Sequence, residues 1–376
     1  MKKIALLGST GSIGRTTLNV VRHLPNEFQV VALAARSNID LLEAQAKEFR
    51  PSIVAVSDLA KASELQKRLP DIYVAAGEEG LCEAAIYGGS DLVVLAMAGN
   101  NGLKPALLAI EAGKSIALAN KEILVCAGEL IMRRTKERNV RLLPVDSEHS
   151  ALFQCLEGHD RKSVRRLILT ASGGPFRTFS EETLGSITVE QALTHPNYRM
   201  GAKITIDSST LMNKGLEMIE ARWLFDTVEI DAVIHPQQVI HSMVEYCDGS
   251  LLAQMSQPDM ALPIQYALTY PQRQKGLLPP FDFSKYSQLT FEEPDRKKFP
   301  CLRLAEESLR SARSYPAFLN ASNEVLVNRF LAREIRWTEI ASKLEKLMSS
   351  HQPVDVLTLE SILAVDCEAR EKARKC

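Results

Sequence analysis

A glycine-rich turn near the start of the chain limits the possible folds more than any other feature of the sequence. The apolar run Lys3–Leu7 leads directly into GSTGSIG at residues 8–14, and a segment of helical period follows from about Arg15. In a strand–turn–helix unit, glycines at this spacing allow a sharp bend and leave backbone amides at a helix N-terminus open to a pyrophosphate. The sequence therefore predicts a dinucleotide-binding turn that contains Gly8, Gly11 and Gly14.

Two other interpretations of this turn are weaker. A Walker P-loop requires GxxxxGK[ST], whereas these glycines fall three residues apart and Arg15 follows the last one. A turn that only packs its helix closely against the sheet remains an alternative. The preceding strand and the following helix favour the dinucleotide site.

The sequence predicts an α/β fold. From Lys3 to about Val145, short apolar runs alternate with segments of helical period, which is typical of βαβ units. The runs are apolar at consecutive positions, as expected for strands covered on both faces. We therefore predict an N-terminal Rossmann-like, doubly wound parallel sheet.

The pattern changes after Asp146 and again near Tyr270. We expect a second α/β catalytic domain with strands at Arg166–Thr170, Lys203–Ile206 and Ser250–Met255, then a Pro- and Lys-rich connecting arm, then helices without strands. The predicted domains are 1–149 for nucleotide binding, 150–270 for the second α/β domain, 271–300 for the connecting arm, and 301–376 for the C-terminal helical domain.

Composition excludes several classes of function. The 376 residues carry 45 Lys plus Arg and 46 Asp plus Glu, so the chain has no broad basic field for nucleic acid or anionic lipid. The longest apolar run, Leu92–Gly99, is far shorter than the roughly 20 residues that span a bilayer. The apolar run Ile4–Leu7 is too short for an export signal.

The cysteines indicate a compartment and limit the metal ligands. Seven cysteines are scattered along the chain without a CxxC pair, which fits reduced thiols in a cytoplasmic protein. We expect a cytoplasmic location. Any metal must then be held by oxygen or histidine.

The end of the second predicted strand indicates which dinucleotide is bound. An NAD-specific site places an acidic side chain about 20 residues after the turn, but here the strand ends in Arg36, Ser37 and Asn38. These side chains are donors for a 2′-phosphate, so NADPH is favoured over NADH. The alternative is an ordinary solvated arginine.

Two further strand ends carry polar residues. The strand Ser115–Ala119 is followed by Asn120-Lys121-Glu122, and the strand Arg141–Val145 by Asp146-Ser147-Glu148-His149. Because ligands of open parallel sheets bind outside the carboxyl ends of strands, Lys121 is a candidate for the reaction centre. The alternative is a surface lysine at a helix start.

Asp146 and Glu148 form a candidate metal site. Two residues apart in an extended chain, they point the same way and repel each other unless they share a proton or bind a cation. A hard divalent ion is the simpler solution. We expect His149 to be structural.

The segment Asp207–Glu217 combines a phosphate site with a further carboxylate. We expect it to open a helix whose polar arc presents Asn213, Lys214 and Glu217. The helix N-terminus with Ser208, Asn213 and Lys214 suits a phosphate, and Glu217 is positioned to complete a metal triad. A solvated polar face is the alternative.

Two loops are weaker candidates. Ser172-Gly173-Gly174 follows a predicted strand and is either an anion-binding turn or a plain reverse turn. The polar loop His195–Gly201 has the composition of a mobile lid.

Seven motifs follow one another along the sequence: GSTGSIG (8–14), LANKE (118–122), PVDSEH (144–149), SGGPFR (172–177), HPNYRMG (195–201), DSSTLMNKGLE (207–217) and IHPQQVIHSMV (234–244). In this order they resemble one known family, that of 1-deoxy-D-xylulose 5-phosphate reductoisomerase. The resemblance covers nearly the whole chain.

The resemblance implies an assembly, cofactors and site residues. It implies a homodimer that uses NADPH and a divalent cation, Mg2+, Mn2+ or Co2+, bound by Asp146, Glu148 and Glu217. The implied contacts to the substrate phosphate are Ser172, His195, Ser208, Asn213 and Lys214, and those to the reacting part are Lys121, Ser147 and Glu148. The implied NADPH contacts are Thr10, Gly11, Ser12, Ile13, Asn38, Asn120, Glu122 and Gly201.

Two positions depart from the family pattern. The family's usual basic residue next to Asn38 is Ser37 here, so Arg36 is the candidate for the 2′-phosphate. The lid position that is commonly tryptophan is Tyr198, which has a smaller apolar face to cover the substrate.

The resemblance implies NADPH-dependent rearrangement and reduction of 1-deoxy-D-xylulose 5-phosphate to 2-C-methyl-D-erythritol 4-phosphate, a step of non-mevalonate isoprenoid biosynthesis. Lys121 is the candidate to stabilise a developing oxyanion, and Glu148 is the leading candidate for the acid/base. The alternatives are a simple NADPH-dependent sugar-phosphate dehydrogenase and, more remotely, a non-catalytic NADPH-sensing protein.

Overall fold

The chain folds into two compact units, and each contains segments from distant parts of the sequence. The structure, a computed structural model, describes residues 1–194 and 201–376. The first unit contains residues 1–123, 131–150 and 257–281, and the second contains 124–130, 151–256 and 282–376. Within the described ranges, no helix is both long and apolar enough to cross a membrane.

The first unit is built on a seven-stranded sheet in the order β4-β3-β2-β1-β5-β6-β7, and every neighbouring pair is parallel. Its central strands are apolar and buried on both faces, which explains their unbroken apolar sequence. The strands are β1 (Lys2–Leu7), β2 (Phe28–Ala35), β3 (Ile53–Val56), β4 (Tyr73–Ala76), β5 (Leu92–Leu95), β6 (Ser115–Leu118) and β7 (Leu142–Pro144).

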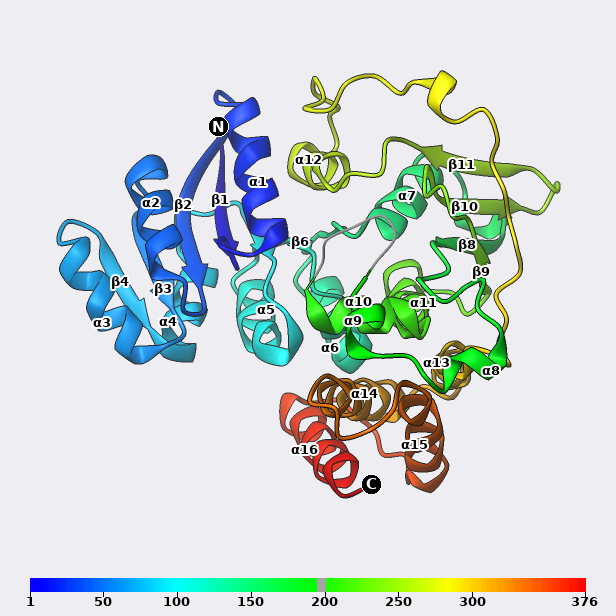
Figure 1. Cartoon of the computed structure of the whole chain (residues 1–376). Helices are drawn as coiled ribbons and strands as arrows, with labels where there is room; N and C mark the ends of the chain where they lie inside the picture. The colour runs from blue at the N-terminus through cyan, green and yellow to red at the C-terminus, as the bar shows by residue number, and fades with distance from the viewer. Residues whose placement is uncertain (195–200) are drawn as a thin grey trace. The chain divides into compact units, whose positions relative to one another are not determined.

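Helices cover both faces of this sheet (Figure 1). Strand order runs outward from β1 in both directions, so right-handed crossovers place α1, α2 and α3 on one face and α4 and α5 on the other. The carboxyl ends of β1 and β5 mark the point where the strand order reverses, the usual ligand position in this fold. The helices are α1 (Ser12–His23), α2 (Ile39–Phe49), α3 (Leu59–Arg68), α4 (Gly77–Ala85), α5 (Leu103–Glu111) and α12 (Ala261–Thr269).

The second unit contains a four-stranded mixed sheet in the order β11-β10-β8-β9. β10 is antiparallel to both its neighbours, and β8 is parallel to β9. The strands are β8 (Val164–Ala171), β9 (Ile230–Ile234), β10 (Ile240–Tyr246) and β11 (Leu251–Met255). The helices of this part are α8 (Glu181–Leu184), α9 (Val189–Ala192), α10 (Ala202–Ser209) and α11 (Met212–Phe225).

The remaining helices include the predicted helical C-terminal region. Two helices, α6 (Lys121–Glu137) and α7 (Ser147–Leu156), contain residues of both units. The last part of the chain has α13 (Pro300–Ser311), α14 (Tyr315–Leu331), α15 (Trp337–Ser350) and α16 (Leu359–Lys375). α14 packs against α13, α15 and α16, and buries most of its residues, as expected for the central helix of a bundle. The predicted α/β fold with a helical C-terminal region is therefore confirmed.

Three local predictions were wrong. Residues 203–206 lie in helix α10 rather than in a strand, because their alternating pattern also fits the buried side of a helix at Thr205, Ile206 and Ser209. The segment 207–217 does not open one helix, because α10 ends at Ser209 and α11 begins only after Leu211, which has φ +60°. Glu148 lies in the first turn of α7, so the extended-chain argument that paired it with Asp146 does not hold.

The cysteines give a direct test of this fold. All seven are free thiols, of which Cys82, Cys126, Cys155 and Cys301 are buried. Burial raises the pKa of the Cys155 thiol to about 11 and that of Cys301 to about 12, which keeps both protonated and unreactive at neutral pH. We expect a thiol reagent to titrate seven groups in the denatured, unreduced chain and to leave these four slow in the folded protein. Fewer than seven thiols before reduction would contradict the assignment.

Candidate functional site

The glycine-rich turn is a cradle that side chains would fill. Gly8 has φ +94°, and a Cβ there would lie 2.5 Å from the backbone oxygen of Ala96, just after β5. A Cβ on Gly14 would lie 2.2 Å from the backbone oxygen of Gly8. Both distances are far below any real Cβ contact, so only glycine lets α1 approach β1 this closely. The turn thus leaves backbone amides at the N-terminus of α1 for an anionic ligand.

A buried glutamine from α2 fixes the same turn. Ser9 Oγ donates to Gln45 Oε1 at 2.7 Å, and Gln45 Nε2 donates back to the Ser9 carbonyl at 3.0 Å. Both residues are buried, so each of these polar groups depends on the other for its hydrogen bonds. Gln45 was not among the residues predicted from the sequence. The available signal was a glutamine in the buried stripe of α2 with Leu42 and Ala46.

The residues after β2 lie at the start of α2. Asn38 is the N-cap of this helix, and its Oδ1 accepts a hydrogen bond from the Leu41 amide at 3.2 Å. Arg36 and Ser37 are exposed. The segment Arg36–Asn38 contains no acidic side chain. The end of β2 is therefore followed by side chains that can donate hydrogen bonds to a ligand.

Asn120, at the end of β6, has a buried acceptor available for a ligand. Its Nδ2 donates to the carbonyl oxygens of Met97 and Gly99, the latter at 2.8 Å. Its Oδ1 is buried and has no hydrogen-bond partner among the described residues. A buried orphan acceptor at a strand's carboxyl end is typical of a site completed by a bound molecule.

Lys121 and Asp146 are brought together in the first unit. The ammonium of Lys121 lies 2.7 Å from Asp146 Oδ2, and the lysine is only 7% exposed. Ser147 Oγ donates to Glu148 Oε2 at 2.7 Å. The ends of β6 and β7, which are neighbouring strands, thus place a lysine, a hydroxyl and two carboxylates at one edge of the sheet.

Glu217 has a similar environment in the second unit. Lys214 forms an ion pair with Glu217, and Asn213 Nδ2 donates to its other oxygen. Glu217 is 1% exposed and Lys214 is 4% exposed, so their charges are compensated within α11. The predicted clustering of these three residues is therefore seen along one turn of this helix.

Ser208 lies on α10, and hydrogen bonds from α14 and α15 fix the position of this helix. Asp207 is 1% exposed, pairs with Lys203 at 2.9 Å and accepts a hydrogen bond from Asn323 of α14 at 2.8 Å. Trp337 of α15 donates to Ser209 Oγ at 2.9 Å. The helical C-terminal region thereby fixes the position of Ser208.

The remaining candidates lie in loops. Ser172 Oγ accepts a hydrogen bond from the Gly174 amide at 3.1 Å, so this segment is a tight turn after β8. Gly174 has φ +70°, and a Cβ there would lie 2.6 Å from the Ser208 carbonyl oxygen, which keeps the turn beside α10. Gly201 is exposed before α10, whereas His195 and Tyr198 lie outside the described residues.

Family models match most of the chain. The model described as 1-deoxy-D-xylulose 5-phosphate reductoisomerase matches residues 4–128, that of its C-terminal domain matches 142–225, and one described as DXP reductoisomerase C-terminal domain matches 255–372. The chain belongs to the 1-deoxy-D-xylulose 5-phosphate reductoisomerase family. This confirms the resemblance inferred from the motifs.

Curated reductoisomerases match over the full length. That of Protochlamydia amoebophila (strain UWE25) is 60% identical over 100% of this chain and 98% of its own length. That of Caldanaerobacter subterraneus subsp. tengcongensis is 53% identical over 99% of this chain and 98% of its own length.

Solved reductoisomerases have the same fold. The enzyme from Zymomonas mobilis in complex with NADPH has a TM-score of 0.94 at 44% identity, covering 100% of this chain and 98% of that one. A reductoisomerase in complex with NADPH, fosmidomycin and magnesium has a TM-score of 0.94 at 41% identity with the same coverage.

Substituting a glycine of the turn tests the cradle. In the variant Gly14→Ala, the added methyl group must push α1 away from Gly8, at a cost of about 1–3 kcal/mol. We expect a lower melting temperature and at least roughly tenfold weaker NADPH binding, since about 1.4 kcal/mol corresponds to a factor of ten. The matched control is Gly88→Ala, where a Cβ would meet nothing within 4 Å. Wild-type NADPH affinity in Gly14→Ala, measured by fluorescence titration, would contradict the prediction.

Proposed function

We propose that this chain converts 1-deoxy-D-xylulose 5-phosphate to 2-C-methyl-D-erythritol 4-phosphate with NADPH and a divalent cation, a step of non-mevalonate isoprenoid biosynthesis. The observation that carries the proposal is the full-length match to reductoisomerases, which a nucleotide cradle and the ion pairs Lys121–Asp146 and Lys214–Glu217 support. The reaction rearranges the carbon skeleton and then adds one hydride and one proton.

The residues of the first unit suit NADPH. The cradle formed by Gly8, Gly11 and Gly14 suits the pyrophosphate, and the orphan Oδ1 of Asn120 suits a donor on the ligand. In our proposal the turn residues Thr10, Ser12 and Ile13 also contact NADPH, as do Asn38, Glu122 and Gly201. Arg36 contacts the 2′-phosphate.

We propose Asp146, Glu148 and Glu217 as the ligands of a divalent cation, Mg2+, Mn2+ or Co2+. All three are carboxylates, the hard oxygen donors that such ions prefer. Asp146 is paired with Lys121 and Glu217 with Lys214, so these two carboxylates already have a compensating cation nearby. When bound, the metal polarises the substrate's ketone oxygen and NADPH supplies the hydride.

The chain's own side chains then bind and orient the substrate. In our proposal Ser172, His195, Ser208, Asn213 and Lys214 hold the phosphate group. Lys121 and Ser147 contact the reacting part of the substrate, where the buried ammonium of Lys121 stabilises developing negative charge. Glu148, which accepts a hydrogen bond from Ser147, is the proposed acid/base.

Two alternative functions make different predictions. A simple sugar-phosphate dehydrogenase would give a product with an unbranched carbon chain, which carbon NMR distinguishes. A non-catalytic NADPH-sensing protein would bind the nucleotide without any dependence on metal. The full-length reductoisomerase match favours neither alternative.

We also propose a division of labour and a location. In this proposal residues 1–149 bind NADPH, and residues 150–270 carry the catalytic, metal and substrate sites. Residues 271–300 form a connecting arm, and the helical domain 301–376 packs against α10. The seven free thiols favour the cytoplasm, where cysteines stay reduced.

The variant Glu217→Gln tests the metal site and the function together. Loss of a charged ligand should weaken Mn2+ binding by at least about 10- to 100-fold, the loss that removing even an outer hydrogen-bond partner typically causes. We expect NADPH oxidation with 1-deoxy-D-xylulose 5-phosphate to be abolished by EDTA and strongly reduced in this variant. The control Glu229→Gln removes an exposed carboxylate from the same unit. Turnover that survives EDTA would overturn the metal requirement.

We propose that the chain forms a homodimer through the edge strand β11. Among the described strands, β11 pairs only with β10, and it exposes Leu251 and Leu252 by 53% and 37%. An exposed apolar edge is a template for pairing with another strand. A second copy of this chain presents the same strand, so a two-fold axis would satisfy both edges.

A charged edge tests the dimer. The double variant Leu251→Lys, Leu252→Lys should run as a monomer of 41.7 kDa in light scattering, whereas the wild type should have twice that mass. The control Leu363→Lys changes an equally exposed leucine on α16 and should leave the dimer intact. A monomeric wild type would rule out the proposed assembly.

A further inference from the structure

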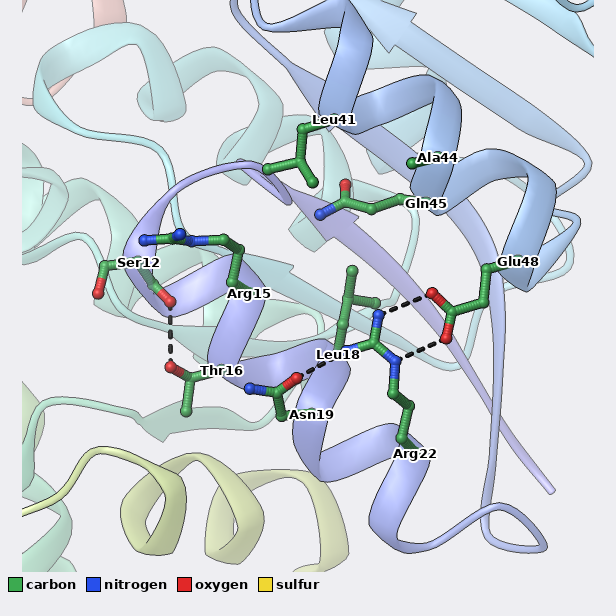
Figure 2. Close-up of a pocket in the computed structure, with 10 residues that line it drawn as sticks. All are labelled: Ser12, Arg15, Thr16, Leu18, Asn19, Arg22, Leu41, Ala44, Gln45 and Glu48. Atoms are coloured by element: carbon green, nitrogen blue, oxygen red, sulfur yellow. Dashed lines mark hydrogen bonds and ion pairs between the residues drawn. The ribbon is translucent and has the colours of Figure 1, made fainter.

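A groove of about 440 Å³ lies between α1 and α2, beside the glycine-rich turn (Figure 2). From α1 it is lined by Ser12, Arg15 and Arg22, and from α2 by Leu41, Gln45 and Glu48. The lining therefore includes the first turn of α1, at Ser12, and the first turn of α2, at Leu41. Arg15 is not among the residues proposed to contact NADPH, the metal or the substrate.

Charge pairing leaves Arg15 as the unbalanced cation of this groove. Arg22 donates to both oxygens of Glu48, at 2.6 and 2.7 Å, so these two charges cancel. The side chain of Arg15 is exposed and forms no hydrogen bond or ion pair with any described residue. The groove thus has a net positive charge, located at its end nearest the turn.

The position of Arg15 directs it to the nucleotide end of the groove. Side chains on a helix lean toward its N-terminus, and Arg15 lies one turn inside α1, directly after Gly14. Figure 2 shows its guanidinium directed toward the N-terminal end of α1 and away from Glu48. Leu41 lines the same groove and lies in the first turn of α2, three residues after the N-cap Asn38.

The strand order brings the two cationic segments to the same edge of the sheet. β1 and β2 are parallel neighbours, so the turn after β1 and the Arg36–Asn38 segment after β2 both leave the sheet at its carboxyl edge. In a dinucleotide site, the adenosine ribose lies at this edge, between the first turn and the end of the second strand. Arg15 and Arg36 therefore lie on the two segments that flank this position.

We propose that Arg15 is a second specificity-determining residue for NADPH, which shares the 2′-phosphate with Arg36. A phosphate monoester carries about −1.5 to −2 charges at neutral pH, so a single guanidinium leaves part of that charge uncompensated. Arg36 is the one cation of the segment Arg36–Asn38, because Ser37 and Asn38 carry no charge. Arg15 supplies a second cation from α1. The inference rests on the proposed use of NADPH.

The experiment measures nucleotide binding without metal or substrate. NADPH and NADH are titrated by fluorescence, and 2′,5′-ADP and 5′-AMP by calorimetry, against wild type, Arg15→Gln, Arg15→Lys and Arg36→Gln. The control Lys67→Gln removes an exposed lysine from α3 of the same unit, whose side chain pairs with no described residue. Solvent partly screens a charge-assisted hydrogen bond at an exposed site, which reduces its contribution to the binding free energy. We therefore expect Arg15→Gln to weaken NADPH and 2′,5′-ADP binding roughly 5- to 20-fold.

NADH and 5′-AMP binding should stay within about twofold of wild type in Arg15→Gln, since they have no 2′-phosphate for the arginine to contact. Arg15→Lys should recover much of the preference, and Lys67→Gln should keep all of it. Equal weakening of NADPH and NADH would overturn the inference, because it would place Arg15 against the adenine instead. An unchanged preference in Arg15→Gln would overturn it as well.

The same data separate the inference from the proposed function. If wild type prefers NADPH and Arg15→Gln keeps that preference, only the role of Arg15 fails. If wild type binds NADH as well as NADPH, the cofactor assignment itself fails, and the inference with it.

Discussion

The close approach of α1 to β1 is the constraint on which the nucleotide half of this molecule depends. A methyl group on Gly14 would lie 2.2 Å from the Gly8 carbonyl oxygen, so the helix can begin this near the strand only with glycine. That approach brings the N-terminal amides of α1 to the carboxyl edge of the sheet. The reciprocal hydrogen bonds between Ser9 and Gln45 then hold the turn in one conformation. A rigid turn costs little entropy when the nucleotide binds.

The proposed reaction centre follows a different principle, the pairing of buried charges. Lys121 pairs with Asp146, and Lys214 pairs with Glu217. Lys121, Lys214 and Glu217 are buried. An isolated buried charge would be costly, and pairing with an opposite charge offsets part of that cost. In our proposal, Asp146, Glu148 and Glu217 would hold the divalent cation, and Lys121 and Lys214 would contact the anionic substrate. The same side chains thus serve stability before binding and, in our proposal, recognition afterwards.

Sequence patterns failed where two kinds of structure share one pattern. Residues 203–206 alternate like a strand, yet burial of Asp207 against Asn323 and of Ser209 against Trp337 requires a helix at this place. Glu148 was expected in an extended chain, but α7 begins one residue earlier. Gln45 was overlooked because its partner Ser9 is 36 residues away, and no local pattern reports such a contact.

The sequence by itself determined the parallel α/β architecture, the glycine cradle and the helical C-terminal region, because each depends on local periodicity or on residues with one allowed geometry. It also indicated the polar residues at the strand ends, since strand direction fixes the edge to which they go. Only the tertiary structure decided that Lys121 pairs with Asp146, that Gln45 fixes the turn and that α10 rests on α14 and α15. Those contacts join residues far apart in the chain, and packing alone selects them.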